Sequence, residues 1–461
     1  MTLSSLHRAA REIFDKTLKS VDAYDAVRRA VHLERSHLML GNTILDLGDY
    51  SAGIYAVAIG KAALPMASAL DEILGLHLTG GLVCSPEAKE FPIRAQPGAR
   101  PSTNGPLSGR WRLFEGGHPL PNRASLDSAR AAMHLLRRAD AERAPVIFLI
   151  SGGGSALIES PRDPGTTLQD LRAANEMLIS SGATILEINS VRRSISAIKG
   201  GALAEIAPNS DQLTLIVSDT NTGEEAAVAS GPSLSHPPDS PDAASVVSRY
   251  GLERALPASI LRAIRRGAER KQSVSTNALR NHYVLLDNQR ALASAAETAR
   301  SHGFTTAISD DLVEQPVAEG CSIMLSQLLE LFRRRDSGER GVCLISGGEF
   351  ACPVRGRGLG GRNAELALRW AIEVAQTKLE GPGIHHVVAL SAGTDGIDGN
   401  SPAAGALCDE TTVKRARHLD LDANRFLEES DAYTFFRSLG DSIITGPTGT
   451  NVRDLRIMIA I

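Results

Sequence analysis

The sequence predicts an α/β protein made of two three-layer α/β/α domains, with mostly parallel sheets and an active-site cleft between the domains. Short apolar runs of strand length end in turns rich in glycine or aspartate. Between those runs lie stretches in which apolar residues recur with a helical period. Apolar runs of this kind are typical of strands that helices cover on both faces, as in parallel sheets.

The expected elements follow one another along the chain. An amphipathic helix occupies residues 1–18, and helical periodicity returns at residues 125–142 and 363–376. The repetition of strand, glycine turn and helix favours parallel sheets. The expected strands, each with its following turn, lie within residues 54–63, 144–157, 213–220, 282–296, 341–349 and 385–396.

The length and the loop composition predict how the chain divides. A chain of 461 residues is too long for one compact core. Residues 229–245 are rich in proline and serine and are the expected linker and hinge. They divide an N-terminal Rossmann-like, acceptor-binding domain at residues 1–237 from a C-terminal α/β domain at residues 238–461. Residues 91–110 have no apolar period, which predicts a surface insertion.

Net charge, apolar run length and cysteine spacing restrict the kinds of partner that this protein is expected to have. The net charge of −4 favours neither nucleic acid nor a membrane surface, and no apolar run approaches the length of a membrane span. The five cysteines form no C-x-x-C pair, which argues against a disulfide framework or a zinc site and fits a reducing cytosol. We therefore expect a cytoplasmic protein that acts on a small molecule. A homodimer and a monomer both remain open.

The run "LISGGGSALI" contains the first candidate site. Ser151, Gly152, Gly153, Gly154 and Ser155 follow an expected strand and precede an expected helix. Glycines at such a turn let backbone N–H groups approach an anion, and a helix N-terminus adds partial positive charge. The alternative is an ordinary tight turn between a strand and a helix. Three glycines between serines favour the anion-binding interpretation.

Two further turns supply positive charge. In "AIGKAA", Lys61 begins a helix directly after a strand and can reach an anionic group, although a solvated surface lysine is the alternative. In "GLGGRNAELAL", the glycines Gly360 and Gly361 precede Arg362 and Asn363 at the start of a helix, a composition that suits a polyphosphate. No G-x-G-x-x-G follows an expected strand, which argues against a nicotinamide site.

Acidic residues at strand ends are the candidate metal ligands. "SAGTDGIDG" places Thr394, Asp395 and Asp398 after one strand, and "IVSDT" places Asp219 after another. Mg²⁺ takes one or two carboxylates and keeps several waters, so Asp395, with or without Asp219, is the expected ligand. Asp398 precedes a glycine and is expected to form a turn instead.

Taken together, these motifs resemble the glycerate 2-kinase family, whose members carry a C-terminal MOFRL domain. The resemblance covers nearly the whole chain. It rests on the number and order of the motifs "AIGKAA", "GGHPLPN", "LISGGGSAL", "NSVRRSISAIKGGALA", "ASGPS", "SGGE", "GLGGRNAELAL", "AGTDGIDG" and "DAYTFFRSLGDSIITGPTGTNVRDL".

The resemblance implies an enzyme that transfers the γ-phosphoryl group of ATP to the 2-hydroxyl of D-glycerate, giving 2-phosphoglycerate, with Mg²⁺ as cofactor. It marks Lys61 and Arg362 as functionally important. The alternatives are a hydroxypyruvate reductase, a label that some members carry, and a kinase for a related small hydroxy acid.

Roles for the remaining motif residues follow as hypotheses. Arg192 and Lys199 are expected to help Lys61 to neutralise charge at the acceptor, and Asp219 is the candidate base. On the ATP side, Thr394 and the "SGGE" residues Gly348 and Glu349 are expected to join the "GLGGRN" turn in binding the nucleotide.

Overall fold

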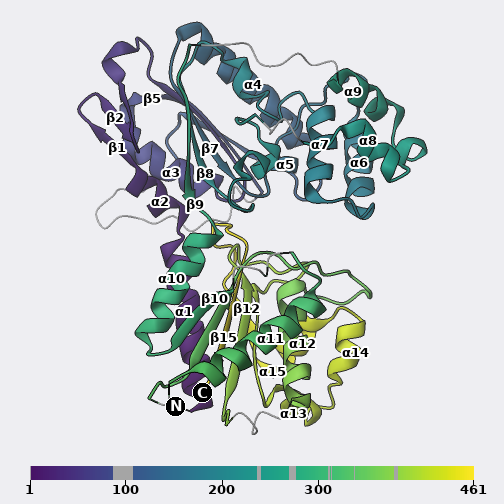
Figure 1. Cartoon of the computed structure of the whole chain (residues 1–461). Helices are drawn as coiled ribbons and strands as arrows, with labels where there is room; N and C mark the ends of the chain where they lie inside the picture. The colour runs from purple at the N-terminus through teal and green to yellow at the C-terminus, as the bar shows by residue number, and fades with distance from the viewer. Residues whose placement is uncertain are drawn as a thin grey trace. The chain divides into compact units, whose positions relative to one another are not determined.

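The computed structural model describes residues 2–86, 107–235, 240–268, 277–309, 312, 314–336, 338–377 and 383–461. The chain forms two compact units (Figure 1). The N-terminal unit is Ala23–Leu285, and the C-terminal unit is Met1–Asp22 together with Leu286–Ile461. The predicted boundary at residue 237 therefore falls inside the N-terminal unit. Most of the expected insertion at 91–110 lies outside the described residues.

The sheet of the N-terminal unit has six strands, and the four strand pairs from β6 to β8 are parallel, which confirms the α/β prediction for this half. Each central strand is buried along its whole length, as expected for strands covered on both faces. In spatial order the strands are β6 (Trp111–Glu115), β5 (Leu78–Ser85), β4 (Ile54–Ile59), β7 (Val146–Ser151), β8 (Gln212–Val217) and β9 (Arg280–Leu286).

Helices and a small second sheet surround this sheet. Alternate residues of β4 (Tyr55, Val57 and Ile59) pack against α4 (Arg123–Glu142). The helix α3 (Ala63–Leu74) also packs on the sheet, beside α2 (Ala23–Ala30). An antiparallel sheet of three strands was not predicted; its strands are β1 (Val31–Glu34), β2 (His37–Leu40) and β3 (Thr43–Asp46).

A group of four helices forms a separate core in the N-terminal unit. They are α6 (Leu168–Ser180), α7 (Ile185–Ile195), α8 (Ala243–Arg249) and α9 (Ala258–Ala268). Because α8 and α9 pack on α6 and α7, residues beyond the proline-rich segment stay in this unit. The strand β9 stays there too, since the Gln212 N–H at the start of β8 donates to the Leu279 carbonyl at 2.7 Å.

The sheet of the C-terminal unit is mostly antiparallel, which corrects the prediction for this half. Among the strands that the structure describes in this unit, only β10 and β11 pair in parallel. The last strand of the chain enters between β11 and β12 and runs against both. In spatial order the strands are β10 (Thr305–Ser309), β11 (Val342–Ser346), β15 (Asp454–Ala460), β12 (Val387–Gly393), β13 (Gly405–Asp409) and β14 (Ser442–Ile443).

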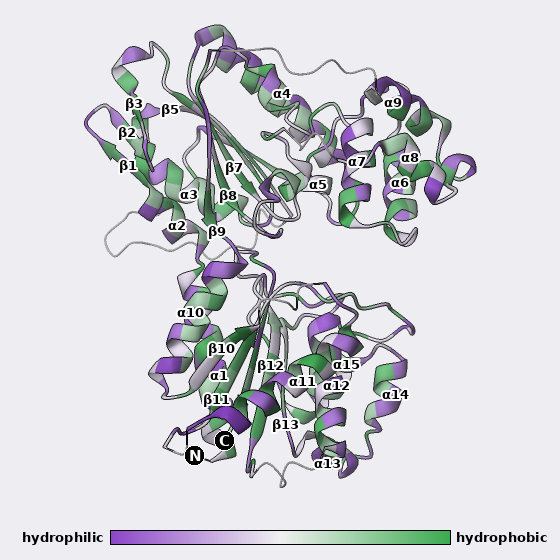
Figure 2. Ribbon diagram, viewed as in Figure 1, coloured by the Kyte–Doolittle hydropathy of each residue, from purple (hydrophilic) through white to green (hydrophobic). Residues whose placement is uncertain are grey.

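Both faces of this second sheet are covered, so the predicted three layers are present here. Val388 and Leu390 of β12 pack with α1 (Leu3–Ser20) and α10 (Asn288–Ser301) on one face. Val387 and Ala389 pack with α11 (Val317–Arg334) and α12 (Arg362–Gln376) on the other. Figure 2 shows the apolar strands between these helices. The short helices α13 (Thr412–Arg417), α14 (Ala423–Glu428) and α15 (Ala432–Leu439) complete the unit.

The first helix explains why the C-terminal unit contains both chain ends. The apolar face of α1, with Leu6, Ile13 and Phe14 fully buried, packs on this sheet. Burying such side chains stabilises the fold by roughly 1.5–3 kcal/mol each, and this gain fixes the helix to the C-terminal unit. Among the residues that the structure describes, no helix is long and apolar enough to cross a membrane.

Candidate active site

The "GK" turn and the "SGGG" turn lie side by side in the N-terminal unit. They leave the neighbouring parallel strands β4 and β7 at the same edge of the sheet. The Lys61 N–H donates to the Gly152 carbonyl at 2.9 Å. The methylenes of Lys61 lie over Gly153, where an added Cβ would come within 3.1 Å of the lysine Cγ and the φ of +78° also favours glycine. The structure therefore brings together two motifs that lie 90 residues apart in the sequence.

Ser151 has a different role from the predicted ligand contact. Its side chain is fully buried, and its Oγ accepts from the Ala62 N–H at 3.0 Å and donates to the Ile59 carbonyl at 3.3 Å. The side chain thus ties the two turns together. Gly60 makes room for it, because a Cβ there would lie 2.2 Å from the Ser151 Oγ.

The remainder of the glycine turn packs against residues 229–231. The helix that follows, α5 (Gly154–Leu157), has a single turn, so the predicted contribution from a helix dipole is small. Gly154 lies so close to Ala229 that an added Cβ would approach the alanine Cβ to 2.5 Å. The Ser155 Oγ is 2.7 Å from the Ser230 Oγ, which in turn donates to Asn189 Oδ1 at 2.9 Å.

Lys199 is internal, which corrects its predicted contact with substrate. Its ammonium group donates to Glu159 Oε2, and both side chains are almost fully buried. Ser196 Oγ and the Ser160 N–H donate to the other carboxylate oxygen at 2.6 and 2.9 Å. Burial lowers the pKa of Lys199, and the adjacent Glu159 carboxylate opposes that shift. The pair joins the loop after β7 to the "KGG" turn.

Arg192 projects from α7 near this buried pair. Its Nε donates to Asn175 Oδ1 at 3.0 Å. Burial lowers the pKa of Arg192, while the Glu159 carboxylate opposes that shift. Within the described ranges of the chain, the two terminal nitrogens of Arg192 have no hydrogen-bond partner. A partly desolvated guanidinium with unused donors is suited to binding an anion. Asp219 lies two residues after the end of β8, the neighbour of β7, and its side chain is half-buried.

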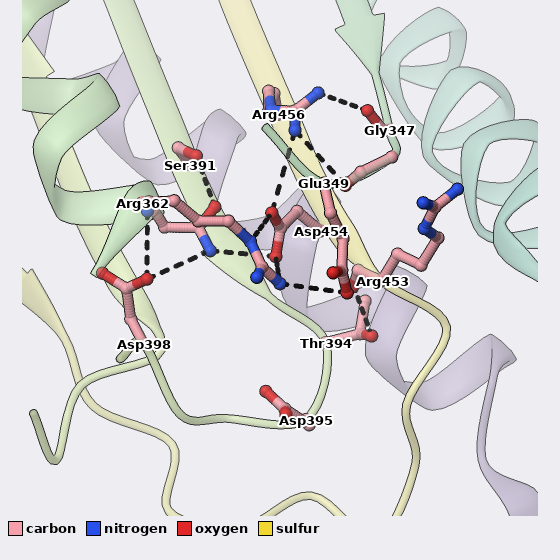
Figure 3. Close-up of polar contacts among 12 residues, drawn as sticks. Gly347, Glu349, Arg362, Ser391, Thr394, Asp395, Asp398, Arg453, Asp454 and Arg456 are labelled. Carbon is pink, nitrogen blue, oxygen red and sulfur yellow. Dashed lines mark hydrogen bonds and ion pairs between the residues drawn. The ribbon is translucent and has the colours of Figure 1, made fainter. Parts of the chain in front are cut away.

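In the C-terminal unit, Arg362 is the first residue of α12 and contacts two carboxylates (Figure 3). Its Nε donates to Asp454 Oδ2 at 2.6 Å, and its Nη2 donates to Asp454 Oδ1 at 3.1 Å. The same Nη2 lies 3.0 Å from Glu349 Oε1. Burial opposes the charge on Arg362, but the two carboxylates outweigh this effect and raise its pKa.

Asp454 was missed by the sequence reasoning. It is the first residue of β15 and pairs with Gly393, the last residue of β12. Its carboxylate is almost fully buried, and it also accepts from Asn363 Nδ2 at 2.9 Å. Burial opposes its ionisation, yet the Arg362 guanidinium outweighs this and lowers the pKa of Asp454. In the sequence, Asp454 could have been recognised as an acidic residue that begins an apolar strand. It lies in the motif that ends in "NVRDL".

A second buried arginine supports the "SGGE" turn. Arg456 donates to the carbonyls of Gly347 and Gly348 and lies 3.5 Å from the centre of the Phe350 ring. Its burial lowers its pKa to about 10. The Gly348 N–H donates to Asn288 Oδ1 at 3.0 Å, so the backbone of Gly348 supports the turn instead of contacting a nucleotide as predicted.

The N-terminus of α12 is capped from within the protein. Asp398 accepts from the Asn363 and Ala364 N–H groups at 3.0 and 2.8 Å. Burial raises the pKa of Asp398 to about 6, although these two N–H donors oppose the shift. Two N–H groups of the helix end that was predicted to bind phosphate are therefore already paired with Asp398. Gly361 allows this contact, because a Cβ there would lie 2.4 Å from Asp398 Oδ1.

Three other residues that were predicted to contact the nucleotide make hydrogen bonds within the C-terminal unit. Asn363 and Thr394 are buried and hydrogen-bonded within the unit, Asn363 to Ser391 at 2.6 Å and Thr394 to the Arg453 carbonyl at 2.6 Å. The Gly360 N–H donates to Asn400 Oδ1 at 2.8 Å. These residues form the framework of the site.

Asp395 and a cavity remain near the surface of the C-terminal unit. The half-buried Asp395 carboxylate accepts from the Ile397 N–H at 3.1 Å, and Figure 3 shows it apart from the Arg362–Asp454 pair. A cavity of about 390 Å³ has Arg362 in its wall. Its other lining residues include Phe350, Pro353, Val354, Glu365 and Asn400.

The predicted site residues therefore fall into two groups. Lys61, the "SGGG" turn, Arg192 and Asp219 belong to the N-terminal unit, and Arg362, Glu349 and Asp395 belong to the C-terminal unit. The two candidate metal ligands, Asp219 and Asp395, thus lie in different units. Within the described part of the chain, the structure has no cluster of three or more acidic, histidine or cysteine side chains that could hold a metal ion.

Comparisons with known proteins match the two halves of the chain to two family models. Residues 9–265 match a family model described as a domain of unknown function (DUF4147), and residues 342–454 match the MOFRL family. A D-glycerate 2-kinase from Thermotoga maritima is 33% identical over 98% of this chain and 98% of its own length. A relative from Agrobacterium vitis, 33% identical over 87% of this chain and 98% of its own length, carries the name of a hydroxypyruvate reductase.

The fold has a solved counterpart. The crystal structure of a glycerate kinase from Thermotoga maritima superimposes with a TM-score of 0.76 at 30% identity. The match covers 99% of this chain and 100% of that chain.

Proposed function

Because this chain belongs to the glycerate kinase family, we propose that it transfers the γ-phosphoryl group of ATP to the 2-hydroxyl of D-glycerate, giving 2-phosphoglycerate. The observation that carries the proposal is the contact between the "GK" and "SGGG" turns. This contact sets a lysine across a glycine turn at the carboxyl edge of a parallel sheet, which is the usual place for a ligand in such sheets.

The acceptor is assigned to the N-terminal unit. The terminal nitrogens of Arg192 would bind the carboxylate of glycerate, and the backbone at Gly152–Gly154 would bind its oxygens. Lys61 would neutralise charge on the migrating phosphoryl group. Partly buried cations suit these roles because electrostatic attraction is stronger where water is excluded.

The donor is assigned to the C-terminal unit. Arg362 would bind the phosphates of ATP, and the cavity beside it would receive the rest of the nucleotide. Asp395 is the carboxylate that fits Mg²⁺, which needs only one or two such ligands from the protein. When bound, Mg²⁺ supplies positive charge to the phosphate oxygens.

Phosphoryl transfer demands positioning and charge neutralisation more than covalent chemistry by the protein. The reacting oxygen and phosphorus must approach to about 3–3.5 Å in line. The Asp219 carboxylate would accept the proton of the 2-hydroxyl. A weak base is sufficient for this step because the transition state is loose.

The test uses purified full-length protein with ATP, Mg²⁺ and a panel of small hydroxy acids. ADP formation is measured by a coupled assay, and the position of the phosphate is measured by phosphorus NMR. We expect 2-phosphoglycerate from D-glycerate with no nicotinamide cofactor present. A parallel arm offers hydroxypyruvate with NADH or NADPH. Oxidation of the cofactor there, without ADP formation in the first arm, would replace the kinase assignment with the reductase alternative.

A further inference from the structure

We propose that Asp454 is the positioning residue that holds the Arg362 guanidinium in the orientation needed to bind phosphate. This inference rests on the proposed kinase function. It gives a role to a residue on the last strand of the chain, about 90 positions from the arginine that it holds.

The geometry of the pair supports this role. Asp454 contacts one side of the guanidinium through Nε and Nη2, at 2.6 and 3.1 Å. Two parallel hydrogen bonds fix the plane of an arginine as well as its position. Nη1 takes no part in this contact, and within the described residues it has no hydrogen-bond partner. The Arg362 side chain is about one-third exposed, and Arg362 lines the cavity described above, where a ligand can reach it.

The two carboxylates on Arg362 are not equivalent. The Asp454 side chain is 1% exposed, whereas that of Glu349 is 35% exposed. Asp454 also accepts from Asn363 and lies 3.7 Å from Arg456, so three groups fix its position. Glu349 contacts Arg362 through Nη2. The buried, two-point contact with Asp454 is therefore the one that fixes the plane of the guanidinium.

The position of β15 explains why Asp454 is suited to this task. Register pairs Asp454 with Gly393 at the end of β12, and the Asp454 N–H donates to the Gly348 carbonyl at 3.2 Å beyond the end of β11. The carboxylate is thus attached to a central strand and not to a loop. A side chain on a packed strand holds its partner more rigidly than one on a loop.

The first test is the Asp454→Asn variant. It keeps the shape but removes the charge, and it places an amide N–H where two donors now point. We expect kcat/KM to fall by roughly two orders of magnitude, the scale seen when an electrostatic group is lost. The loss should appear in kcat and in the KM for ATP, while the KM for glycerate should change less than threefold.

A double-mutant cycle separates positioning from general damage. If Asp454 acts through Arg362, then Asp454→Asn in an Arg362→Ala background should lower the remaining activity by less than about twofold, because the two residues act as one unit. A further loss of tenfold or more in that background, or an Asp454→Asn enzyme with full activity, overturns the proposal.

Asp409→Asn is the matched control. Asp409 is another buried aspartate of the same sheet, lies 2.8 Å from His7 and 3.6 Å from Arg415, and pairs with Val388 at the opposite end of β12. The Asp409→Asn variant should lose thermal stability but keep the kcat of the wild type. If kcat fell equally in this variant, the loss in Asp454→Asn would reflect damage to the fold, which would contradict the proposal.

A second variant covers the case in which Asp454→Asn does not fold. Asp454→Glu keeps the charge and shifts the guanidinium by one methylene group, so it should fold and still lose at least tenfold in kcat. Full kcat in this variant overturns the positioning role.

ATP affinity, measured by calorimetry, distinguishes this inference from the proposed function. A wild-type protein that binds ATP but forms no ADP with glycerate overturns the proposed function. The positioning role is then still tested by whether Asp454→Asn and Arg362→Ala weaken ATP binding equally. Unequal losses contradict it.

Discussion

At the scale of single residues, charge and burial separate side chains that bind ligands from those that support them. Lys61 and Lys199 both adjoin glycine in the sequence, but Lys61 is half-buried at a turn and Lys199 is almost fully buried against Glu159. A charged group that binds a ligand must remain accessible, whereas a buried one needs a permanent partner. The two lysines therefore have different predicted phenotypes.

Lys61→Ala is expected to lower kcat/KM by roughly two orders of magnitude or more, because it removes charge stabilisation from the transition state. The melting temperature should barely change, since the side chain lies at a surface turn. Lys16→Ala is the control, because Lys16 is an exposed lysine that pairs with Glu12 on the same helix. Steady-state kinetics of the folded Lys61→Ala protein test this prediction. An unchanged kcat/KM would show that Lys61 is an ordinary surface lysine.

Lys199→Met is expected to act on stability. It leaves the Glu159 charge buried without its partner, which typically costs about 3–5 kcal/mol. The Lys199→Met, Glu159→Leu double variant should recover much of that loss, because no buried charge remains. Urea unfolding measures both variants. Equal destabilisation by the single and double variants would show that the ion pair itself, and not the unpaired charge, determines the effect.

At the scale of secondary-structure elements, the N-terminus of α12 leads to a prediction about stability and pH. The α12 N-terminus begins at Arg362, and Asp398 caps it from the loop after β12. This cap fixes where Arg362 leaves the helix. The cap is itself titratable in the range of ordinary buffers, since burial raises the pKa of Asp398 from 3.8 to about 6.

The raised pKa gives stability a predictable pH dependence. The pKa of Asp398 is higher in the folded protein than in the unfolded chain. Its contribution to the free energy of unfolding is therefore fully present below about pH 4 and is lost as the pH rises through about 6. Relative to Asp398→Asn, the wild type should lose about 2 kcal/mol of unfolding free energy between pH 4 and 7. Urea unfolding at several pH values checks this. A constant difference between the two proteins would mean that Asp398 is ionised throughout.

At the scale of the whole molecule, the chain passes between the two units at residues 22–23 and 285–286. The proline-rich segment at 229–245, the predicted hinge, belongs to the N-terminal unit in its described part. We therefore expect the hinge at these two crossings and not in the proline-rich segment. Since the acceptor and the donor are assigned to different units, their reaction requires the two units to bring the ligands together.

Closure is therefore expected when both ligands are present. Small-angle scattering should show a smaller radius of gyration with glycerate and a non-hydrolysable ATP analogue than without ligands. Each ligand alone serves as the control and should produce a smaller change. An unchanged radius at saturation, in protein shown to be active, would mean that the site is preformed.

Local elements and turns could be predicted from the sequence alone. Strands such as β4 and β7, the helices α1, α4 and α12, and the glycine turns beside Lys61 and Arg362 all lie where apolar periodicity and glycine placed them. These features depend on neighbours within a few residues, and periodicity records such neighbours directly. Steric demand explains several of the glycines, because a Cβ at Gly60 or Gly361 would collide with a partner.

The pairing of elements and the burial of individual side chains could be seen only in the folded protein. The insertion of β15 between β11 and β12 brought Asp454 to Arg362, the apolar face of α1 joined the first helix to the last sheet, and Glu159 enclosed Lys199. Each outcome depends on contacts between residues far apart in the chain. A local pattern shows that a strand or helix has an apolar face, but it does not specify which distant face will cover it.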